Sequence, residues 1–505
     1  MAQSKVYWVS CLNTLKESTK ITDLVLGQME PTPYRMVTAI KELIHSGVDI
    51  AYDDFQWNNV FLRSVRIGHV VAVKLLLEMG AEIATRDPDG LSALLLASKN
   101  GHEAVVRHLL ESGADISATL NKDGSTALHV AVDNGHSAVV KLLLEMGANT
   151  SAIDNDGSTA LLRAASNGQE RIVTLLLENR ADVSIMNRSG ATALSHAARN
   201  GHEAIVRHLL EKEADVASKE EMALPWAAQK GHAAVVKLLL EKGAKPSTKN
   251  EDGSTALHLA TSNGHEATVK ALLENGADTS VRQTKTAFTA LHLAVSNGHD
   301  AIVKLLLGAG ADMSITEDDS GGVALHLAAA NGHNEIVKFL LDNGADIRVR
   351  QGRKGSTPLH LAAAKGHEAV VRVLLEKEGA SHAAPRVEVN LFRKKRTFIS
   401  EKDETGKTAL HLAASGGHRP TLRLLLEEGV DTSWKDNVGD TALHLAAKAG
   451  HEKTVELLLQ YKADVSAKNK NGSYVVDVAI TKDVKDLLRK HGAKDSWNRG
   501  INAFL

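Results

Sequence analysis

The sequence is poor in several residue types, and each shortage narrows the class of protein. Cys11 is the only cysteine among 505 residues, so a disulfide framework and a thiolate zinc site within one chain are both excluded. Aromatic residues make up only 3% of a chain that is 43% hydrophobic, so Leu, Val, Ile and Ala dominate its apolar content. No apolar run approaches the roughly 20 residues that cross a bilayer, and Met1–Ser10 lacks the apolar core of a secretory signal. These absences predict a soluble intracellular protein without a membrane-inserted segment.

The sequence also lacks an excess of positive or negative charge, and it lacks the short motifs that are typical of enzyme active sites. The net charge is -2, so the chain as a whole is not attracted to nucleic acid or to anionic membranes. The sequence contains no H-E-x-x-H, no C-x-x-C, no phosphate-binding glycine loop and no G-x-S-x-G. We therefore expect no catalytic residues, no cofactor and no metal site.

A Gly-His pair, or a close equivalent, recurs along almost the whole chain. Eleven steps separate twelve successive glycines, and nine of those steps are 33 or 34 residues; the glycines are Gly68, Gly101, Gly135, Gly168, Gly201, Gly231, Gly264, Gly298, Gly332, Gly366, Gly417 and Gly450. The two other steps are 30 and 51 residues. This regularity predicts a stack of similar units in which each contacts only its neighbours.

The unit that begins at Asp123 predicts a pair of short helices. Thr126 can cap a first helix whose buried stripe has helical spacing, and Gly135 ends it where a positive φ is needed; the stripe is Leu128, Ala131 and Val132. A second helix follows with a broad apolar face and stops at Gly147; that face holds Val139, Val140, Leu142, Leu143 and Leu144. A polar turn, here called a finger, then leads to the next pair. Stability is expected to come from stacking, because one pair alone exposes its apolar face.

These units resemble ankyrin repeats. The resemblance rests on T-A-L-H-L-A at Thr255–Ala260 and Thr441–Ala446, T-P-L-H-L-A-A at Thr357–Ala363, and G-H-x-x-x-V-x-x-L-L at Gly366–Leu375. It implies an all-α ankyrin-repeat solenoid of helix pairs with β-turn or hairpin fingers. We expect the solenoid over residues 34–493, with about twelve full repeats and a terminal half-repeat cap at Tyr34–Ile50 and at Gly472–Ala493. Residues 1–33 are interpreted as an N-terminal extension, either a capping helix or a tail, and residues 494–505 as a C-terminal tail.

Most of the 24 histidines belong to the repeat rather than to a catalytic or metal site. Eleven follow a turn glycine, from His69 to His451, and seven occupy the A-L-H or P-L-H position; these seven are His129, His258, His292, His326, His360, His411 and His444. The resemblance implies that the seven hydrogen-bond the backbone of a neighbouring unit.

Three neighbouring units depart from the template, and departures of this kind often mark functional sites. The usual His-Leu pair becomes Leu162-Arg163, Ser195-His196 and Pro225-Trp226, and the finger before Trp226 is three residues short. Stacking would align Arg163, His196 and Trp226, flanked by Arg199 and Lys230, and the resemblance places this side of the helices in a concave groove. Trp and Arg are frequent interface hot spots, so these five residues predict a cationic, aromatic groove for an acidic peptide segment. The alternative is drift within a degenerate repeat, with Trp226 filling the space left by the short finger.

A second departure is an insertion at about residues 381–399, where the 51-residue step falls. It contains the basic run Arg393, Lys394, Lys395 and Arg396, and its alternating Val387, Val389 and Leu391 predict an elongated hairpin. The preceding finger is also basic, so one positive patch is expected; that finger supplies Arg348, Arg350, Arg353 and Lys354. The run also resembles a nuclear-import signal, but such runs are common by chance, and a solvated loop is the simpler interpretation.

The sequence therefore favours a non-enzymatic scaffold or adaptor that binds other proteins through its groove and finger tips. We expect a monomer in the cytoplasm, with the nucleus as a second location, and no nucleic-acid partner. One alternative is a nuclear or chromatin-associated regulator that uses the basic insertion. The other is an enzyme built on the groove, which requires His196 within hydrogen-bond reach of a nucleophile or a carboxylate.

Overall fold

The structure, a computed structural model, describes residues 54–78, 80–212, 214, 222–317, 321–380 and 398–493. Within those ranges it contains 26 α-helices and one short 3-10 helix, and no strand; the fingers carry only isolated β-bridges such as Arg86 with Ser92. The expected all-α architecture of helix pairs is confirmed. The interpretations made for residues 1–33, 34–50 and 494–505 lie outside the described residues. Contacts divide the chain into one compact unit of Met1–Ala227 with Glu241–Ala244, and a second of Ala228–Leu240 with Lys245–Leu505.

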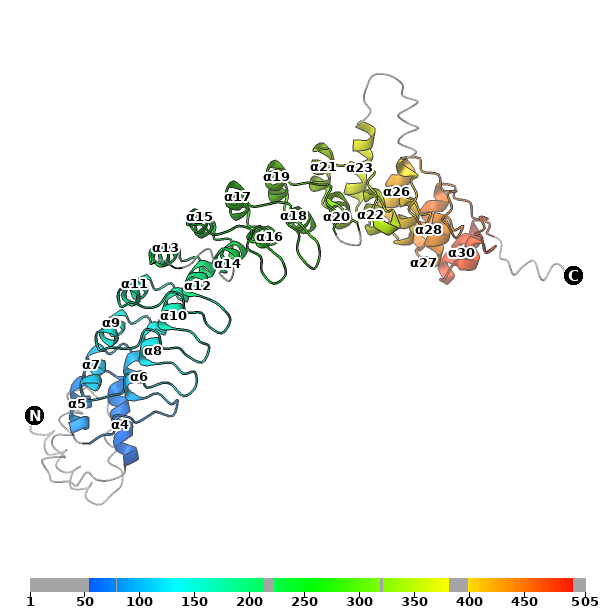
Figure 1. The fold of residues 1–505 in the computed structure, drawn as a ribbon. Helices are drawn as coiled ribbons and strands as arrows, with labels where there is room; N and C mark the ends of the chain where they lie inside the picture. Colours follow the sequence, from blue (N-terminus) through cyan, green and yellow to red (C-terminus); the bar gives the residue numbers. More distant parts are fainter. Residues whose placement is uncertain are drawn as a thin grey trace, which may run out of the picture. The chain divides into compact units, whose positions relative to one another are not determined.

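The first unit is a run of helix pairs. Their bounds are α4 Asp54–Arg66, α5 Val70–Glu78, α6 Ala93–Lys99, α7 Glu103–Glu111, α8 Ala127–Asp133, α9 Ser137–Glu145, α10 Ala160–Ser166, α11 Glu170–Glu178, α12 Ala193–Asn200 and α13 Glu203–Glu211. The first helices of successive pairs pack on one another in one row, and the second helices form a parallel row (Figure 1). The fingers project on the far side of the first helices from the second helices (Figure 1).

The second unit repeats the same plan. Helices α14 Ala223–Lys230 and α15 Ala233–Glu241 each contain residues of both units. The remaining bounds are α16 Ala256–Ser262, α17 Glu266–Glu274, α18 Ala290–Asn297, α19 Asp300–Gly308, α20 Ala324–Asn331, α21 Asn334–Asp342, the 3-10 helix η1 Gly352–Lys354, α22 Pro358–Lys365, α23 Glu368–Ala380, α25 Ala409–Ser415, α26 Arg419–Glu427, α27 Ala442–Ala449, α28 Glu452–Gln460, α29 Val475–Val478 and α30 Lys482–Lys490.

Helices α8 and α9 show the N-cap, the turn glycine and the buried apolar faces that the sequence predicts. Thr126 is the N-cap of α8, and its hydroxyl accepts a hydrogen bond from the amide of His129. Gly135 adopts a φ of 73° just beyond the helix. The predicted apolar stripe of α8 and all five predicted apolar residues of α9 are buried. Full burial of each Val or Leu side chain contributes about 1.5–3 kcal/mol of transfer free energy, so these faces form the core of the repeat.

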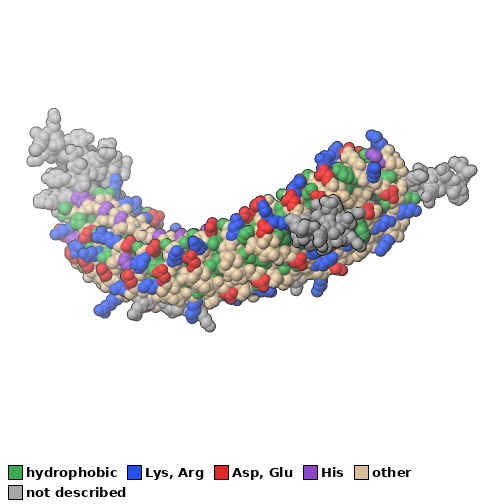
Figure 2. All heavy atoms as spheres, turned by 90° about the horizontal axis from the view of Figure 1, so that it is seen from above, with side chains coloured by type: hydrophobic (Ala, Val, Ile, Leu, Met, Phe, Trp, Pro, Cys, Tyr) green, Lys and Arg blue, Asp and Glu red, His purple; other side chains and the backbone are tan. Residues whose placement is uncertain are grey.

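The surface carries no large field of one sign on the face shown in Figure 2, where Lys and Arg side chains are interspersed with Asp and Glu. Among the described helices none is long and apolar enough to cross a membrane.

Candidate functional site

A cleft opens in the first unit where fingers meet first helices. It has a volume of about 530 Å³, and we call it the finger cleft. Its lining comes from the ends of the first helices and from two consecutive fingers; these residues are Asp133, Leu162, Arg163, Ser166, Asn167 and His196 on the helices, and Asp154, Asp156, Ser158, Asn187, Arg188 and Ser189 on the fingers. Finger residues vary from repeat to repeat while the helices keep their frame, so this is where the first unit can acquire specificity.

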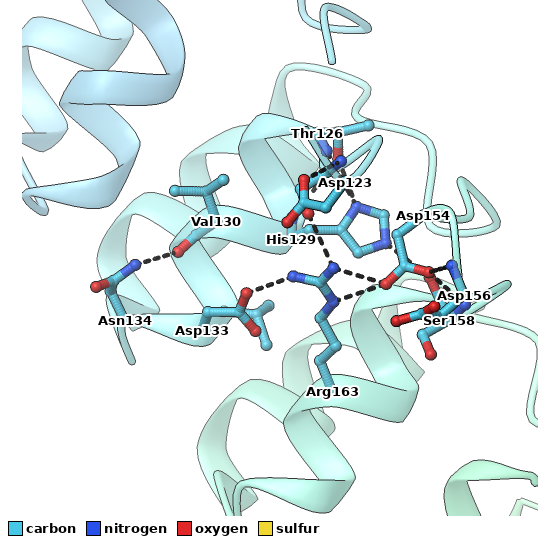
Figure 3. A network of polar contacts seen from close by, with 12 residues as sticks. Asp123, Thr126, His129, Val130, Asp133, Asn134, Asp154, Asp156, Ser158 and Arg163 are labelled. Atoms are coloured by element: carbon cyan, nitrogen blue, oxygen red, sulfur yellow. Dashed lines mark hydrogen bonds and ion pairs between the residues drawn. The ribbon is translucent and has the colours of Figure 1, made fainter. Parts of the chain in front are cut away.

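Arg163 lines the finger cleft and is held by carboxylates (Figure 3). Its Nε and Nη2 donate to Oδ2 of Asp154 at 3.0 and 2.6 Å, and Nη2 also donates to Oγ of Ser125 at 2.8 Å. Its Nη1 forms an ion pair with Asp133 at the end of α8. The Arg163 side chain is only 17% exposed and that of Asp154 only 4%. Arg163 therefore joins two consecutive repeats and offers no free positive charge.

Opposing effects set the charges of this network. Burial raises the pKa of Asp133, although Arg163 pulls it down. Burial also raises the pKa of Asp154, but the hydrogen bonds from Arg163 and from the Ser158 amide outweigh it, and the pKa is lowered overall. Its Oδ1 also accepts from the amides of Asp156 and Ser158 at 2.7 and 2.8 Å. The network is thus a compensated charge cluster rather than a free cation, which differs from the cationic role expected for Arg163.

His196, Arg199 and Trp226 come together, and we call them the His-Arg-Trp cluster. The rings of His196 and Trp226 meet edge to face, with centroids 6.2 Å apart and an interplanar angle of 63°. The Arg199 guanidinium lies over the Trp226 ring at 5.3 Å. Trp226 and His196 are half-buried, whereas Arg199 is exposed. Lys230 is exposed at the end of α14, in the second compact unit.

His196 is kept neutral by its surroundings. Burial and then the positive charge of Arg199 lower its pKa below the ordinary value of 6.5. Its Nε2 lies 3.4 Å from the side-chain amide nitrogen, Nδ2, of Asn187. Among the described residues no hydrogen bond joins it to a carboxylate or to a hydroxyl, the groups that the enzyme alternative requires within its reach.

The basic finger patch expected in the second unit is partly neutralised. Arg348 forms ion pairs with Glu378 and Glu401, both at 2.5 Å, and lies over the ring of Phe398 at 5.3 Å. Arg350 approaches Glu401 at 3.9 Å. Arg353 and Lys354 are exposed in η1, and the basic run Arg393–Arg396 lies outside the described residues. The prediction of one merged positive patch did not account for Glu378, which precedes the insertion, or for Glu401, which follows it.

The insertion begins differently from an ordinary finger. Helix α23 has 13 residues where α21 has nine, so it continues to Ala380 instead of stopping at a glycine turn. At the end of the insertion, Phe398 and Ile399 are buried. Phe398 is therefore part of the core.

The seven histidines of the A-L-H and P-L-H positions are structural, as expected. In His129 the Nδ1 atom accepts from the Thr126 amide at 3.3 Å, and the Nε2–H donates to the Ser158 carbonyl of the next repeat at 3.0 Å. The same inter-repeat bond spans 3.0–3.4 Å for five others, namely His258, His326, His360, His411 and His444. Burial lowers the pKa of all seven, and that of His292 falls to about 4. The predicted hydrogen bonds to neighbouring repeats are confirmed for these six histidines, whereas the buried Nε2 of His292 has no hydrogen-bond partner among the described residues.

The histidines that follow the turn glycines link repeats in the opposite direction. His102 Nε2 lies 2.9 Å from the carbonyl of Arg66, 36 residues earlier, and His136 lies 2.9 Å from the carbonyl of Lys99. Gln169 occupies the same position in its repeat and donates to the Val132 carbonyl at 2.6 Å. Within the described residues no group of three or more His, Cys, Asp or Glu side chains is arranged to hold a metal ion.

Comparison with known families identifies the repeat. The family model described as ankyrin repeats in three copies matches residues 34–120, 117–187, 182–250, 224–317, 303–386 and 387–469. No curated protein matches the chain closely enough to count as a relative.

Proposed function

The chain belongs to the ankyrin-repeat family, and we propose that it is a non-enzymatic scaffold or adaptor that binds partner proteins through the finger cleft and the His-Arg-Trp cluster. Ankyrin repeats generally act as protein–protein interaction modules. The identity of the family supports binding as the activity, and the departures from the repeat support this place on the first unit.

The single observation that carries the proposal is the Arg199–Trp226 stack at 5.3 Å beside the finger cleft. A half-buried tryptophan under a guanidinium offers a flat apolar surface and a charge on one rigid base, and both residue types are common hot spots. In this proposal the Arg199–Trp226 pair contacts an acidic side chain of the partner. Arg163 acts differently, because its bonds to Asp133 and Asp154 hold the cleft in shape rather than contact a ligand.

A binding function also agrees with the chemistry of the cluster. His196 has a lowered pKa, its Nε2 lies beside the side-chain amide of Asn187, and its ring meets that of Trp226 edge to face. A neutral imidazole against Trp226 completes an aromatic surface for contact with a peptide.

Affinity capture with quantitative mass spectrometry tests the proposal. Wild-type protein, Trp226→Ala, Arg199→Glu and the control Arg171→Glu are compared; Arg171 is exposed on the second helix α11 of the same unit. We expect one set of proteins to be depleted by both cluster variants and retained by the control. Equal recovery with all four proteins would remove the assignment of this site.

A further inference from the structure

A row of lysines links three successive fingers of the second unit. Lys402, Lys435 and Lys468 occupy the same position of their repeats, 33 residues apart. The Lys402 Nζ donates to the carbonyl of Lys435 at 2.8 Å, and the Lys435 Nζ donates to the carbonyl of Lys468 at 2.7 Å. Arg350 extends the row by one finger, because its Nη1 donates to the carbonyl of Lys402 at 3.1 Å. We call Lys402, Lys435 and Lys468 the lysine ladder.

The charges of the ladder are not neutralised by the nearest acids. Asp403 and Asp436 follow two of the lysines directly, but their Oδ1 atoms accept backbone amides of their own fingers at 2.9 Å. In the described part of the chain, none of the three ammonium groups takes part in an ion pair. An ammonium group has three N–H donors, and the ladder bonds of Lys402 and Lys435 use one donor each. Each of the two therefore keeps donors for a carboxylate from outside.

Aromatic rings lie within the same row. The Lys402 Nζ is 4.7 Å from the centre of the Trp434 ring, and the Lys468 Nζ is 4.7 Å from that of Tyr474. Trp434 is 40% exposed, which is unusual for a large aromatic side chain. The row therefore combines positive charge with one exposed aromatic ring, that of Trp434, whereas Tyr474 is buried.

The spacing of the ladder selects a conformation for its ligand. Packed helices of neighbouring repeats lie roughly 8–10 Å apart, so successive ladder lysines recur at about that distance. A polyproline II segment turns once in three residues and rises about 9 Å, which places every third side chain on one edge. Such segments also dock on exposed aromatic residues, and Trp434 is an exposed aromatic residue in this row.

We propose that the lysine ladder binds a proline-rich segment of a partner protein that carries an acidic residue at every third position. The proposal concerns residues other than those of the finger cleft and does not depend on that site. Nucleic acid fits this surface less well, because one cation per repeat neutralises few phosphates.

Fluorescence anisotropy with the full-length chain tests the ladder. The probe is a labelled peptide of four Glu-Pro-Pro units, and a peptide of the same composition with its four glutamates adjacent serves as the isomer. We expect the periodic peptide to bind more tightly than the isomer and more tightly than a labelled oligo-dT strand. The triple change Lys402→Glu, Lys435→Glu and Lys468→Glu is expected to weaken binding at least about tenfold.

Matched variants separate the ladder from bulk charge and from loss of structure. The control Lys237→Glu, Lys270→Glu and Lys338→Glu makes the same charge change on exposed second-helix positions of the second unit and is expected to leave affinity unchanged. The conservative change of all three ladder lysines to arginine keeps the charges and is expected to retain binding. The proposal is overturned if the wild type does not bind the periodic peptide, if both glutamate triples weaken binding equally, or if the oligo-dT strand binds more tightly.

Discussion

Two arginines of the first unit show how neighbours decide what one residue type does. Arg163 is 17% exposed and bonded to two carboxylates, whereas Arg199 is exposed and lies over Trp226. The difference arises from residues in adjacent repeats, since Asp133 precedes Arg163 by 30 positions along the chain. The first arginine is expected to matter for stability and the second for binding.

Replacing Arg163 with methionine should destabilise the protein by about 2 kcal/mol, because the change leaves Asp154 buried without its cation. Thermal unfolding followed by circular dichroism measures the effect. Arg188→Met changes an exposed arginine that lines the same cleft and should alter stability little. Equal melting temperatures for the two variants would contradict the structural role of Arg163.

The seven buried histidines predict that stability falls on acidification. Their folded-state pKa values lie below 6.5, so below that pH the unfolded chain binds more protons than the folded chain. The stability they contribute is complete above pH 6.5 and is lost as the pH falls toward their folded pKa values, about 4 for His292. For His292 alone the loss is on the order of 3 kcal/mol. Urea unfolding between pH 7 and pH 4.5 should show this decline; constant stability across that range would refute it.

At the scale of the helix pair, a turn glycine and the next repeat's histidine fit together. Gly101 has a φ of 75°, and an added Cβ would lie 2.6 Å from Nδ1 of His136. Gly113 ends the second helix of the same pair with a φ of 90° and open space around it. Both Gly→Ala changes place an alanine at a positive φ, which is unfavourable, but only Gly101→Ala also displaces the ring of His136.

Gly101→Ala is therefore expected to destabilise the protein by about 1 kcal/mol more than Gly113→Ala. Chemical denaturation of the two variants measures this difference directly. If both variants lose the same stability, the ring of His136 has room to move, and its bond to the Lys99 carbonyl does not hold the repeats together.

The two ends of the insertion are held by one arginine. Arg348 pairs with Glu378 on the last turns of α23 and with Glu401 beyond the insertion. Arg348→Met leaves Glu378, 4% exposed, without its partner. We expect amide hydrogen exchange in the last turn of α23 to become at least about tenfold faster, with a smaller change elsewhere. The exposed Arg353→Met is the control, and unchanged exchange in the Arg348 variant would show that the ion pairs do not fasten the helix end.

For the molecule as a whole, the regular features were predictable and the long-range polar contacts were not. The period of the glycines, the Thr126 cap and the apolar faces of α8 and α9 follow from local chemistry, and the structure confirms them. Ion pairs between repeats depend on which side chains meet across a stack, so Asp133 and Asp154 could not be assigned to Arg163 from spacing within one unit.

The lysine ladder marks a further limit of prediction from the sequence. Its residues precede the Asp or Asn of each finger, a position that looks like ordinary solvated surface in any single repeat. Only an alignment of the fingers with one another shows that the position is basic in successive repeats. The extension of α23 was also not evident, because Gly379 looks like a stop signal and instead lies inside the helix.

Photo-crosslinking in cells tests the central claim, that the protein binds partners through the finger cleft, most directly. A benzophenone amino acid replaces exposed Asn167, which lines the cleft, or exposed Arg171 on α11 as the control. The account predicts a crosslinked partner from position 167 that is absent from position 171 and disappears when Trp226→Ala is added. Identical products from both positions, or a product that survives Trp226→Ala, would contradict it.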